Sequence, residues 1–289
     1  MSGISFSGSS DDERDALWRV IGLLRQFTVD ITAVMDAAVG TSYSDNRQSR
    51  AALHLTRHGA VGLRELAEVS GLSRRALDHL LAEWREAGTV VRVRDPRDRR
   101  TLLVRPTSRG RRSLDVCRRR MGALFVAHQR TAKEIVDELD HHVLDDSDQT
   151  PPTDETDVID LAIALTRVGD VIDDRHRAAT RGHVPRRRAL LALLVISERG
   201  GEIRPSDLAE ALTMTSGGTT YLLNQLEQRR LIRRAHGRRD DRRAVVVTLT
   251  PAGTRAVDAF FVAVHRAAPE IRQVFLAVRD FDQQLTEQR

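Results

Sequence analysis

Arginine side chains are concentrated in two stretches of the chain, and this clustering suits the binding of phosphate groups and base edges. Residues 92–120 contain twelve arginines against three aspartates, and residues 229–243 contain eight arginines against two aspartates. Guanidinium groups neutralise backbone phosphates and can donate two parallel hydrogen bonds to guanine. The net charge of the whole chain is only +5, so the clustering, and not the overall charge, predicts a nucleic-acid-binding surface.

The two arginine-rich stretches occupy corresponding places in an internal repeat. The repeated motifs are Leu66-Ala67-Glu68, Asp98-Arg99-Arg100 and Thr107-Ser108-Arg109-Gly110, with the counterparts Leu208-Ala209-Glu210, Asp241-Arg242-Arg243 and Thr250-Pro251-Ala252-Gly253. Their spacing agrees to within one residue, so the copies match almost without insertion. Two copies are too few for a solenoid. The repeat therefore predicts a fused pair of like domains, an arrangement suited to reading DNA with two-fold geometry.

Apolar residues at alternating spacings of three and four predict a long first helix in each copy. A second and a third helix follow, and the third is paired across a turn with a fourth, as in a helix-turn-helix. Ser73 and Thr215 stand before the fourth helix, where their hydroxyls can cap its open amides. The first three helices are expected at 17–34, 49–57 and 63–69 in the first copy and at 158–172, 188–198 and 205–212 in the second.

Two β-prone runs follow the fourth helix in each copy and bracket a polar loop, which predicts a β-hairpin wing. They cover residues 90–93 and 102–104 in the first copy and 231–232 and 244–249 in the second. Each copy then closes with one long amphipathic helix, and Pro269 should kink the second of these helices. The predicted fold class is mainly α with small β-wings, that is, α+β.

Composition and the repeat together predict the domain organisation. Forty per cent apolar and 30% charged residues are typical of a soluble globular protein, and 4% aromatic residues favour helices over a β-sandwich. No apolar run approaches the roughly 20 residues of a membrane span, and no signal peptide is evident. We therefore expect a cytoplasmic protein that has no membrane partner. The expected parts are a disordered tail at 1–10, a first domain at 11–144, an acidic linker at 145–157 and a second domain at 158–289.

Both copies resemble the MarR family of winged-helix transcription factors, and the resemblance covers nearly the whole chain. Besides the repeated motifs, it is carried by Gly71-Leu72-Ser73, Leu80-Leu81, Gly88 and Asp95-Pro96-Arg97-Asp98-Arg99-Arg100 in the first copy, and by Met214 to Thr219, Leu226-Glu227 and Leu249 to Gly253 in the second. The resemblance implies a sequence-specific transcription regulator, acting as a ligand-responsive repressor on double-stranded promoter DNA. It further implies a small aromatic effector, for which Trp18, Trp84 and His54 are candidate lining residues.

Members of this family are usually homodimers whose first and last helices interlock, so the resemblance implies an intramolecular pseudo-dimer formed by one chain. The apolar stripes on the terminal helices agree with this, because a lone copy would leave them exposed. The recognition helices enter the major groove in this family. The corresponding candidate DNA contacts are Ser73, Arg74, Arg75, Asp78 and His79 in the first copy, and Thr215, Ser216, Gly217, Thr220, Tyr221 and Asn224 in the second.

The two recognition helices differ in chemistry. Arg74 and Arg75 suit guanine or nearby phosphate, whereas the hydroxyls and glycines of the second helix suit phosphate or thymine-methyl contact. Thr219 fits either a DNA contact or inward packing. The operator should therefore have two unequal half-sites about one turn, roughly 34 Å, apart.

The two predicted wings differ as well. In the first, Arg97 resembles the tip arginine that enters the minor groove, Arg99 and Arg100 are further candidate contacts, and Asp98 with Arg100 would hold the hairpin by ion pairing. The second wing departs from the family pattern, because Arg238 and Asp240 replace the usual aspartate and tip arginine. Its candidate DNA contacts are Arg238, Arg239 and Arg242, and its candidate ion-pairing residues are Asp241 and Arg243.

Other chemistry finds little support. The chain lacks the phosphate-binding, nucleophile-elbow and zinc-protease motifs, so no enzyme, metal or cofactor is expected. Cys117 lies on an apolar stripe, which favours a buried structural thiol over an oxidant sensor. His54 and His58 have a helical spacing that can chelate a metal, but no further ligand stands at an obvious position. Trp84 is favoured as a core residue over a ligand contact.

Two other functions are compatible with the same residues. The first is a sequence-tolerant architectural protein that uses its arginines for phosphates alone, and a small ratio of specific to random-site affinity would distinguish it. The second is a protein-binding scaffold whose degenerate second copy no longer touches DNA. Replacement of Arg238 and Arg239 by alanine would then leave DNA affinity unchanged.

Overall fold

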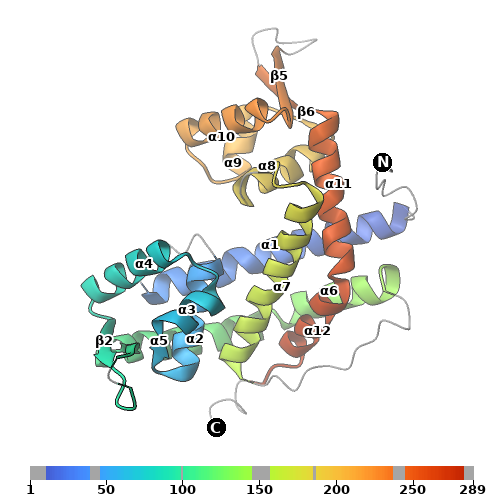
Figure 1. Cartoon of the computed structure of the whole chain (residues 1–289). Helices are drawn as coiled ribbons and strands as arrows, with labels where there is room; N and C mark the ends of the chain where they lie inside the picture. The colour runs from blue at the N-terminus through green and yellow to red at the C-terminus, as the bar shows by residue number, and fades with distance from the viewer. Residues whose placement is uncertain are drawn as a thin grey trace. The chain divides into compact units, whose positions relative to one another are not determined.

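Helices predominate in the computed structural model of the protein (Figure 1). The structure describes residues 11–39, 46–98, 100–144, 157–184, 187–236 and 245–282. These residues divide into two compact units: a larger unit of residues 11–170 and 267–282, and a smaller unit of residues 171–266. The predicted tail at 1–10 and residues 145–156 of the predicted linker lie outside the described residues.

The larger unit contains a helix-turn-helix and a wing, preceded and followed by long helices. Its elements are α1 (Asp11–Val39), α2 (Asn46–His58), β1 (Val61–Gly62), α3 (Leu63–Ser70), α4 (Arg74–Glu86), β2 (Val90–Arg94), β3 (Leu102–Pro106), α5 (Ser108–Ala127), α6 (Gln129–His142), the first part of α7 (Val158–Ala179) and α12 (Ala268–Arg279).

The smaller unit repeats this order of elements around its own sheet. After the rest of α7 it contains α8 (Arg187–Glu198), β4 (Glu202–Ile203), α9 (Pro205–Ala211), α10 (Ser216–Gln228), β5 (Ile232–His236), β6 (Val245–Leu249) and α11 (Pro251–Arg266). The predicted α+β class with winged helix-turn-helix elements is thus observed in both units. None of the described helices combines the length and the apolar character that crossing a membrane requires.

Each wing belongs to a three-stranded antiparallel sheet, in the orders β1-β3-β2 and β4-β6-β5. The predicted hairpins are confirmed, with Val90 opposite Pro106 and Ile232 opposite Leu249. The short strands β1 and β4 were not predicted, because two residues are too few to show an alternating pattern. Each joins its sheet through β3 or β6, and thereby ties the start of the helix-turn-helix to the wing.

The helix-turn-helix of each unit forms where the apolar pattern predicts it. Leu77, Leu80, Leu81 and Trp84 are buried on α4, and Thr219, Leu222, Leu223 and Leu226 are buried on α10. The Ala76 amide donates to the Ser73 hydroxyl (3.3 Å), and the Gly218 amide donates to the Thr215 hydroxyl (3.2 Å). Both predicted N-caps are therefore confirmed.

The predicted long closing helices are both interrupted, which corrects the sequence-based expectation. The break between α5 and α6 is at His128, and that between α11 and α12 is at Ala267. Both residues leave the helical region, with φ near −100° and ψ near 0°. Pro269 lies in the first turn of α12, where a proline is tolerated. The corresponding break between α5 and α6 forms without a proline, so a proline is not needed to interrupt the closing helix. Pro269 therefore lies at the start of a new helix and does not kink a continuous one.

The core of the larger unit joins segments from both ends of the chain. Helix α1 packs against α5 and α6, and α12 packs against α6. The ring of Phe275 on α12 lies edge-on to Phe27 of α1, with centroids 5.2 Å apart, and Phe281 lies edge-on to Phe125 of α5 at 5.4 Å. The Gln129 side chain donates to the Phe281 carbonyl (2.7 Å).

Ion pairs add to this packing within the larger unit. Arg272 of α12 pairs with Asp140 of α6. On α7, Asp160 pairs with Arg57 of α2, and Asp170 pairs with Arg50. The second half of the sequence therefore supplies both apolar and charged contacts to the unit that holds the first helix-turn-helix.

The smaller unit buries a histidine between its long helices. His176 of α7 is 5% exposed, and its Nε2 lies 3.1 Å from the Ala256 carbonyl of α11. The Phe260 ring stands edge-on to it at 5.7 Å. Burial lowers the pKa of His176, so at neutral pH this side chain packs as an uncharged imidazole.

Candidate nucleic-acid interface

The first candidate recognition surface is the exposed face of α4. Arg74, Arg75, Asp78 and His79 are all exposed there. Asp78 accepts a hydrogen bond from Arg92 of β2 (2.8 Å), and His79 lies 3.2 Å from Glu83. Among the described residues, no ion-pair partner is found for Arg74 or Arg75. Two unpaired guanidinium groups at the start of the helix are thus available for an external acceptor.

The first wing is held by hydrogen bonds to its own backbone. The Arg97 amide donates to Asp95 (2.8 Å), and the Arg100 amide (3.0 Å) and Thr101 hydroxyl (2.8 Å) donate to Asp98. The two bonds to Asp98 lower the pKa of its carboxyl group, and the bond from the Arg100 amide has the larger effect. The predicted ion pair between Asp98 and the Arg100 guanidinium is therefore replaced by a turn in which the carboxylate binds the amide two residues on.

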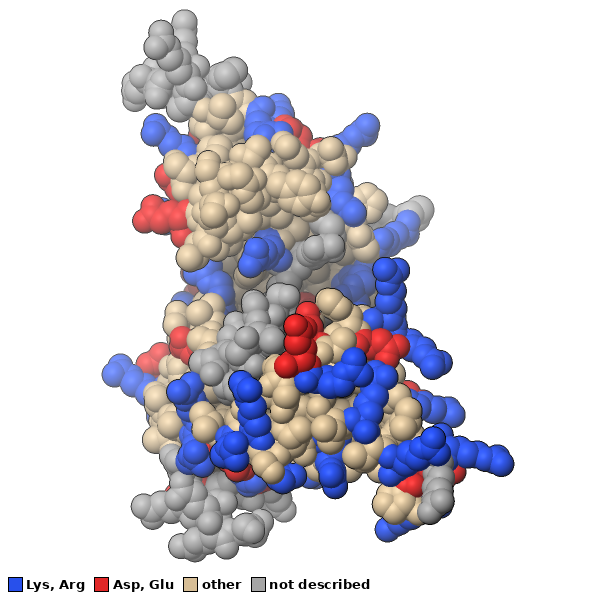
Figure 2. Space-filling model, turned by 90° about the vertical axis from the view of Figure 1, so that its left-hand side faces the viewer, with Lys and Arg blue, Asp and Glu red and all other residues tan. Residues whose placement is uncertain are grey.

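This turn leaves the first wing's cations at the surface. Arg97 and Arg100 are exposed. Arg99 lies outside the described residues. In Figure 2 basic side chains are widely distributed over the lower part of the molecule, which contains the first wing.

The exposed face of α10 differs from that of α4 because it carries no formal charge. Ser216, Gly217, Thr220, Tyr221 and Asn224 are exposed, and Tyr221 retains 66% of its accessible surface. Thr219, for which two roles were open, is buried (2% exposed) and donates to the Thr215 carbonyl. Figure 2 shows a broad area without charged side chains on the upper part of the molecule, which is the smaller unit.

An arginine that was not predicted links each recognition helix to its wing. Arg234 of β5 donates to Glu227 and to the Asn224 side-chain oxygen (2.7 Å) of α10. Arg92 of β2 contacts Asp78 of α4 in the same manner. Both arginines occupy the third position of their strand, and that repeat was the available signal.

The predicted contacts of the second wing cannot be described in the same way. Arg238, Arg239, Asp241, Arg242 and Arg243 lie outside the described residues. Their proposed contacts and ion pairs remain predictions.

A glycine brings each closing helix against the backbone that precedes the wing. A Cβ atom at Gly110 of α5 would lie 2.0 Å from the Thr89 carbonyl oxygen, and one at Gly253 of α11 would lie 2.1 Å from the Leu231 carbonyl oxygen. The capping hydroxyls of Thr107 and Thr250 also donate to this backbone, to Gly88 (2.7 Å) and Arg230 (2.6 Å). The same close approach therefore positions both wings relative to their closing helices.

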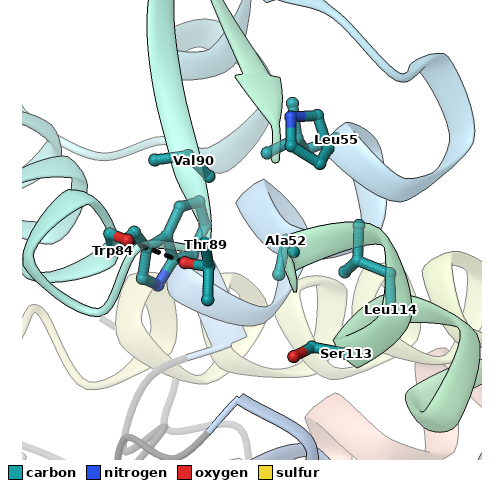
Figure 3. Close-up of a pocket in the computed structure, with 9 residues that line it drawn as sticks. Ala52, Leu55, Trp84, Thr89, Val90, Ser113 and Leu114 are labelled. Atoms are coloured by element: carbon teal, nitrogen blue, oxygen red, sulfur yellow. Dashed lines mark hydrogen bonds between the residues drawn. The ribbon is translucent and has the colours of Figure 1, made fainter. Parts of the chain in front are cut away.

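The apolar cavity in Figure 3 lies between α2, α4, the wing and α5 of the larger unit. Its volume is about 30 Å³, which is too small for an aromatic effector. Trp84 lies on its lining, is 3% exposed and receives a hydrogen bond from the Thr89 hydroxyl at its carbonyl (2.8 Å). The expected core role of Trp84 is confirmed.

Cys117, His54 and His58 contact neighbouring side chains in the larger unit. Cys117 is buried with its sulfur 3.4 Å from the Met35 sulfur, and burial raises the pKa of its thiol to about 11. His54 contacts Glu65 (2.8 Å), and its ring lies 4.3 Å from that of His58. Within the described ranges, no group of three or more potential metal ligands is found.

Comparisons with known proteins find a family model and several solved structures that are similar to parts of the chain. No curated protein matches the chain. Solved structures that are similar include YusO from Bacillus subtilis, with 20% identity over 45% of this chain and 86% of that chain and a TM-score of 0.30. They also include AbsC, a MarR family transcriptional regulator from Streptomyces coelicolor, with 21% identity over 48% and 90% and a TM-score of 0.30. Residues 184–244, which contain α8 to β5, match the model of the MarR family, and this segment of the chain is therefore MarR-like.

Proposed function

We propose that this protein is a sequence-specific transcription regulator that binds double-stranded promoter DNA. The observation that carries the proposal is the pair of recognition helices, α4 and α10, each with a capped N-terminus and an exposed face linked to a wing strand by an arginine. Such a helix fits the major groove, and an arginine-bearing wing can reach backbone phosphates or the minor groove.

The functional unit in this proposal is one chain acting as a pseudo-dimer. Its support is the packing of α12 and the start of α7 in the larger unit, since MarR-like dimers are held by their terminal helices. Ion pairs such as Arg272 with Asp140 add charge complementarity to this packing. A single chain that supplies both recognition helices binds without a concentration-dependent dimerisation step.

Because α4 and α10 carry different chemistry, the operator consists of two unequal half-sites about one helical turn, roughly 34 Å, apart. The test is selection of bound sequences from a random duplex pool, with the mass of the complex measured in parallel. Two different half-sites bound by one chain support the proposal. Salt-sensitive binding without any enriched sequence would favour the architectural alternative, and a palindrome bound by two chains would contradict the pseudo-dimer.

Replacement of Arg75 by alanine should weaken binding to the selected operator about 10- to 100-fold, because an arginine that contacts a base edge contributes roughly 1–3 kcal/mol of discrimination. Titration of operator and random duplexes at one salt concentration measures the effect. Arg130→Ala is the matched control, since Arg130 is exposed on α6 and its ion-pair partner among the described residues is Glu134. A loss that is equal for both duplexes would assign Arg75 to phosphate contact instead.

The regulator releases DNA in this proposal when a small aromatic effector binds. An open groove of about 480 Å³ between α1 and α5 offers room; its lining includes the apolar Val34 and Leu124, the cation Arg120, and Asp30, which is paired with His128 (3.1 Å). This lining suits an aromatic carboxylate, so benzoate is the first probe. Millimolar benzoate should weaken operator binding in the native chain and have no such effect in Arg120→Ala; equal effects on both would exclude this groove.

A further inference from the structure

Two polar groups on the exposed face of α10, the Thr220 hydroxyl and the Asn224 side-chain oxygen, are already hydrogen-bonded within the protein. The Thr220 hydroxyl donates to the Ser216 carbonyl (2.9 Å). The Asn224 side-chain oxygen accepts from Arg234 (2.7 Å), which also binds Glu227. An asparagine whose oxygen is already bonded is poorly placed to make the usual bidentate contact with adenine, because that contact needs its oxygen as an acceptor.

This face also offers apolar groups to a ligand. The methyl group of Thr220 remains when its hydroxyl is turned to the helix backbone, and the Tyr221 ring is 66% exposed. Gly217 lies one turn before Tyr221, and a Cβ atom there would have no neighbour within 4 Å. Because residues four apart share a helix face, the open space at Gly217 lies on the same face of α10 as Tyr221.

We propose that α10 recognises thymine through its C5-methyl group, by contact with Thr220 and Tyr221. Among the four bases only thymine presents a methyl group in the major groove, and side-chain methyl and aromatic groups are the usual contacts to it. Arg234 acts as a positioning residue, since it holds Asn224 and restricts that side chain to donating. This inference rests on the proposed function and names the base chemistry of one half-site.

Helix α4 should recognise its half-site without contacting a thymine methyl group. Its exposed cations, Arg74 and Arg75, are suited to the acceptors of guanine, and the carboxylate of Asp78 beside them is bound by Arg92. The two half-sites therefore differ in their dependence on thymine methyl groups, and each methyl group can be removed from the DNA separately.

The experiment uses the full chain and the operator obtained by selection. Each thymine is replaced singly by deoxyuridine, which removes only the C5-methyl group and preserves base pairing. We expect a loss of affinity of about threefold to tenfold at one or two positions, consistent with the burial of one methyl group or slightly more. All sensitive positions should lie in a single half-site.

The variant Thr220→Ser then assigns the contact. Serine keeps the hydroxyl and its bond to the Ser216 carbonyl but lacks the methyl group, so this variant should discriminate clearly less than the native chain between the thymine and deoxyuridine operators, and the remaining discrimination reports the Tyr221 contact. Thr32→Ser is the matched control, because Thr32 makes the same bond to the carbonyl four residues earlier, on α1. It should retain the native discrimination.

Failure of this inference can be distinguished from failure of the proposed function. An operator with no uracil-sensitive position overturns methyl reading and leaves the proposed regulator intact. If Thr220→Ser binds the thymine operator with native affinity and loses as much affinity for the deoxyuridine operator as the native chain does, the assignment to Thr220 is also overturned. If selection enriches no sequence, both the proposed function and this inference are wrong.

Discussion

Replacement of Gly110 by alanine is expected to destabilise the larger unit by about 3 kcal/mol or more, a typical upper range for overpacking in a tight interior. The new Cβ atom would lie 2.0 Å from the Thr89 carbonyl oxygen. That neighbour is backbone, and it also accepts the Thr107 amide (2.9 Å), so it cannot rotate away as a side chain would. Relief requires the start of α5 to separate from the segment before β2.

Gly253→Ala should have the same effect in the smaller unit, where the Leu231 carbonyl oxygen would lie 2.1 Å from the added atom. The two effects can be separated because both tryptophans of the chain, Trp18 and Trp84, belong to the larger unit. In urea unfolding, Gly110→Ala should shift the transition seen by tryptophan fluorescence. Gly253→Ala should leave the fluorescence transition unchanged. It should shift the unfolding transition of the smaller unit, which far-ultraviolet circular dichroism detects.

Gly22→Ala is the control for the substitution itself. Gly22 is an exposed residue inside α1, and a Cβ atom there would meet nothing within 4 Å. Alanine is favoured over glycine in a helix interior by roughly 0.5–1 kcal/mol, so this variant should be slightly more stable than the native chain. Unfolding midpoints that are unchanged in Gly110→Ala and Gly253→Ala would show that the close approach is absent.

The elements with strong local patterns were predictable from the sequence. The apolar faces of α4 and α10, the capping residues Ser73 and Thr215 and the two hairpins all follow from residue type and spacing over a few positions. These features depend on neighbours in the chain, so periodicity and side-chain chemistry suffice to place them.

The features that sequence reasoning missed depend on contacts between distant segments or on a choice among hydrogen-bond partners. The breaks at His128 and Ala267 leave the apolar periodicity nearly unchanged, so a single stripe suggested a single helix. Asp98 could bind either the Arg100 guanidinium or its amide, and only the turn geometry favours the amide. The Arg234 contact with Asn224 spans ten residues and two elements, which no local pattern encodes.

Replacement of Phe275 by alanine is expected to lower the free energy of unfolding of the larger unit by about 3–4 kcal/mol, the usual cost of removing a buried aromatic ring. Phe275 is 1% exposed and contacts Phe27 edge-on. Although it lies near the end of the sequence, its loss should shift the fluorescence transition that Trp18 and Trp84 report. Phe275→Leu retains most of the buried apolar surface and should cost less than about 1.5 kcal/mol.

The Phe275 variants also test the single-chain pseudo-dimer. They change the packing of α12 and leave the sequence of the first winged helix unaltered. If α12 completes the core, Phe275→Ala leaves a cavity in that core and should also weaken operator binding in proportion to the unfolded fraction. Lower temperature or added operator should then restore binding, since DNA favours the folded state. A fluorescence transition that is identical in the native chain and Phe275→Ala would mean that α12 does not pack there, and the proposed pseudo-dimer would lose its main support.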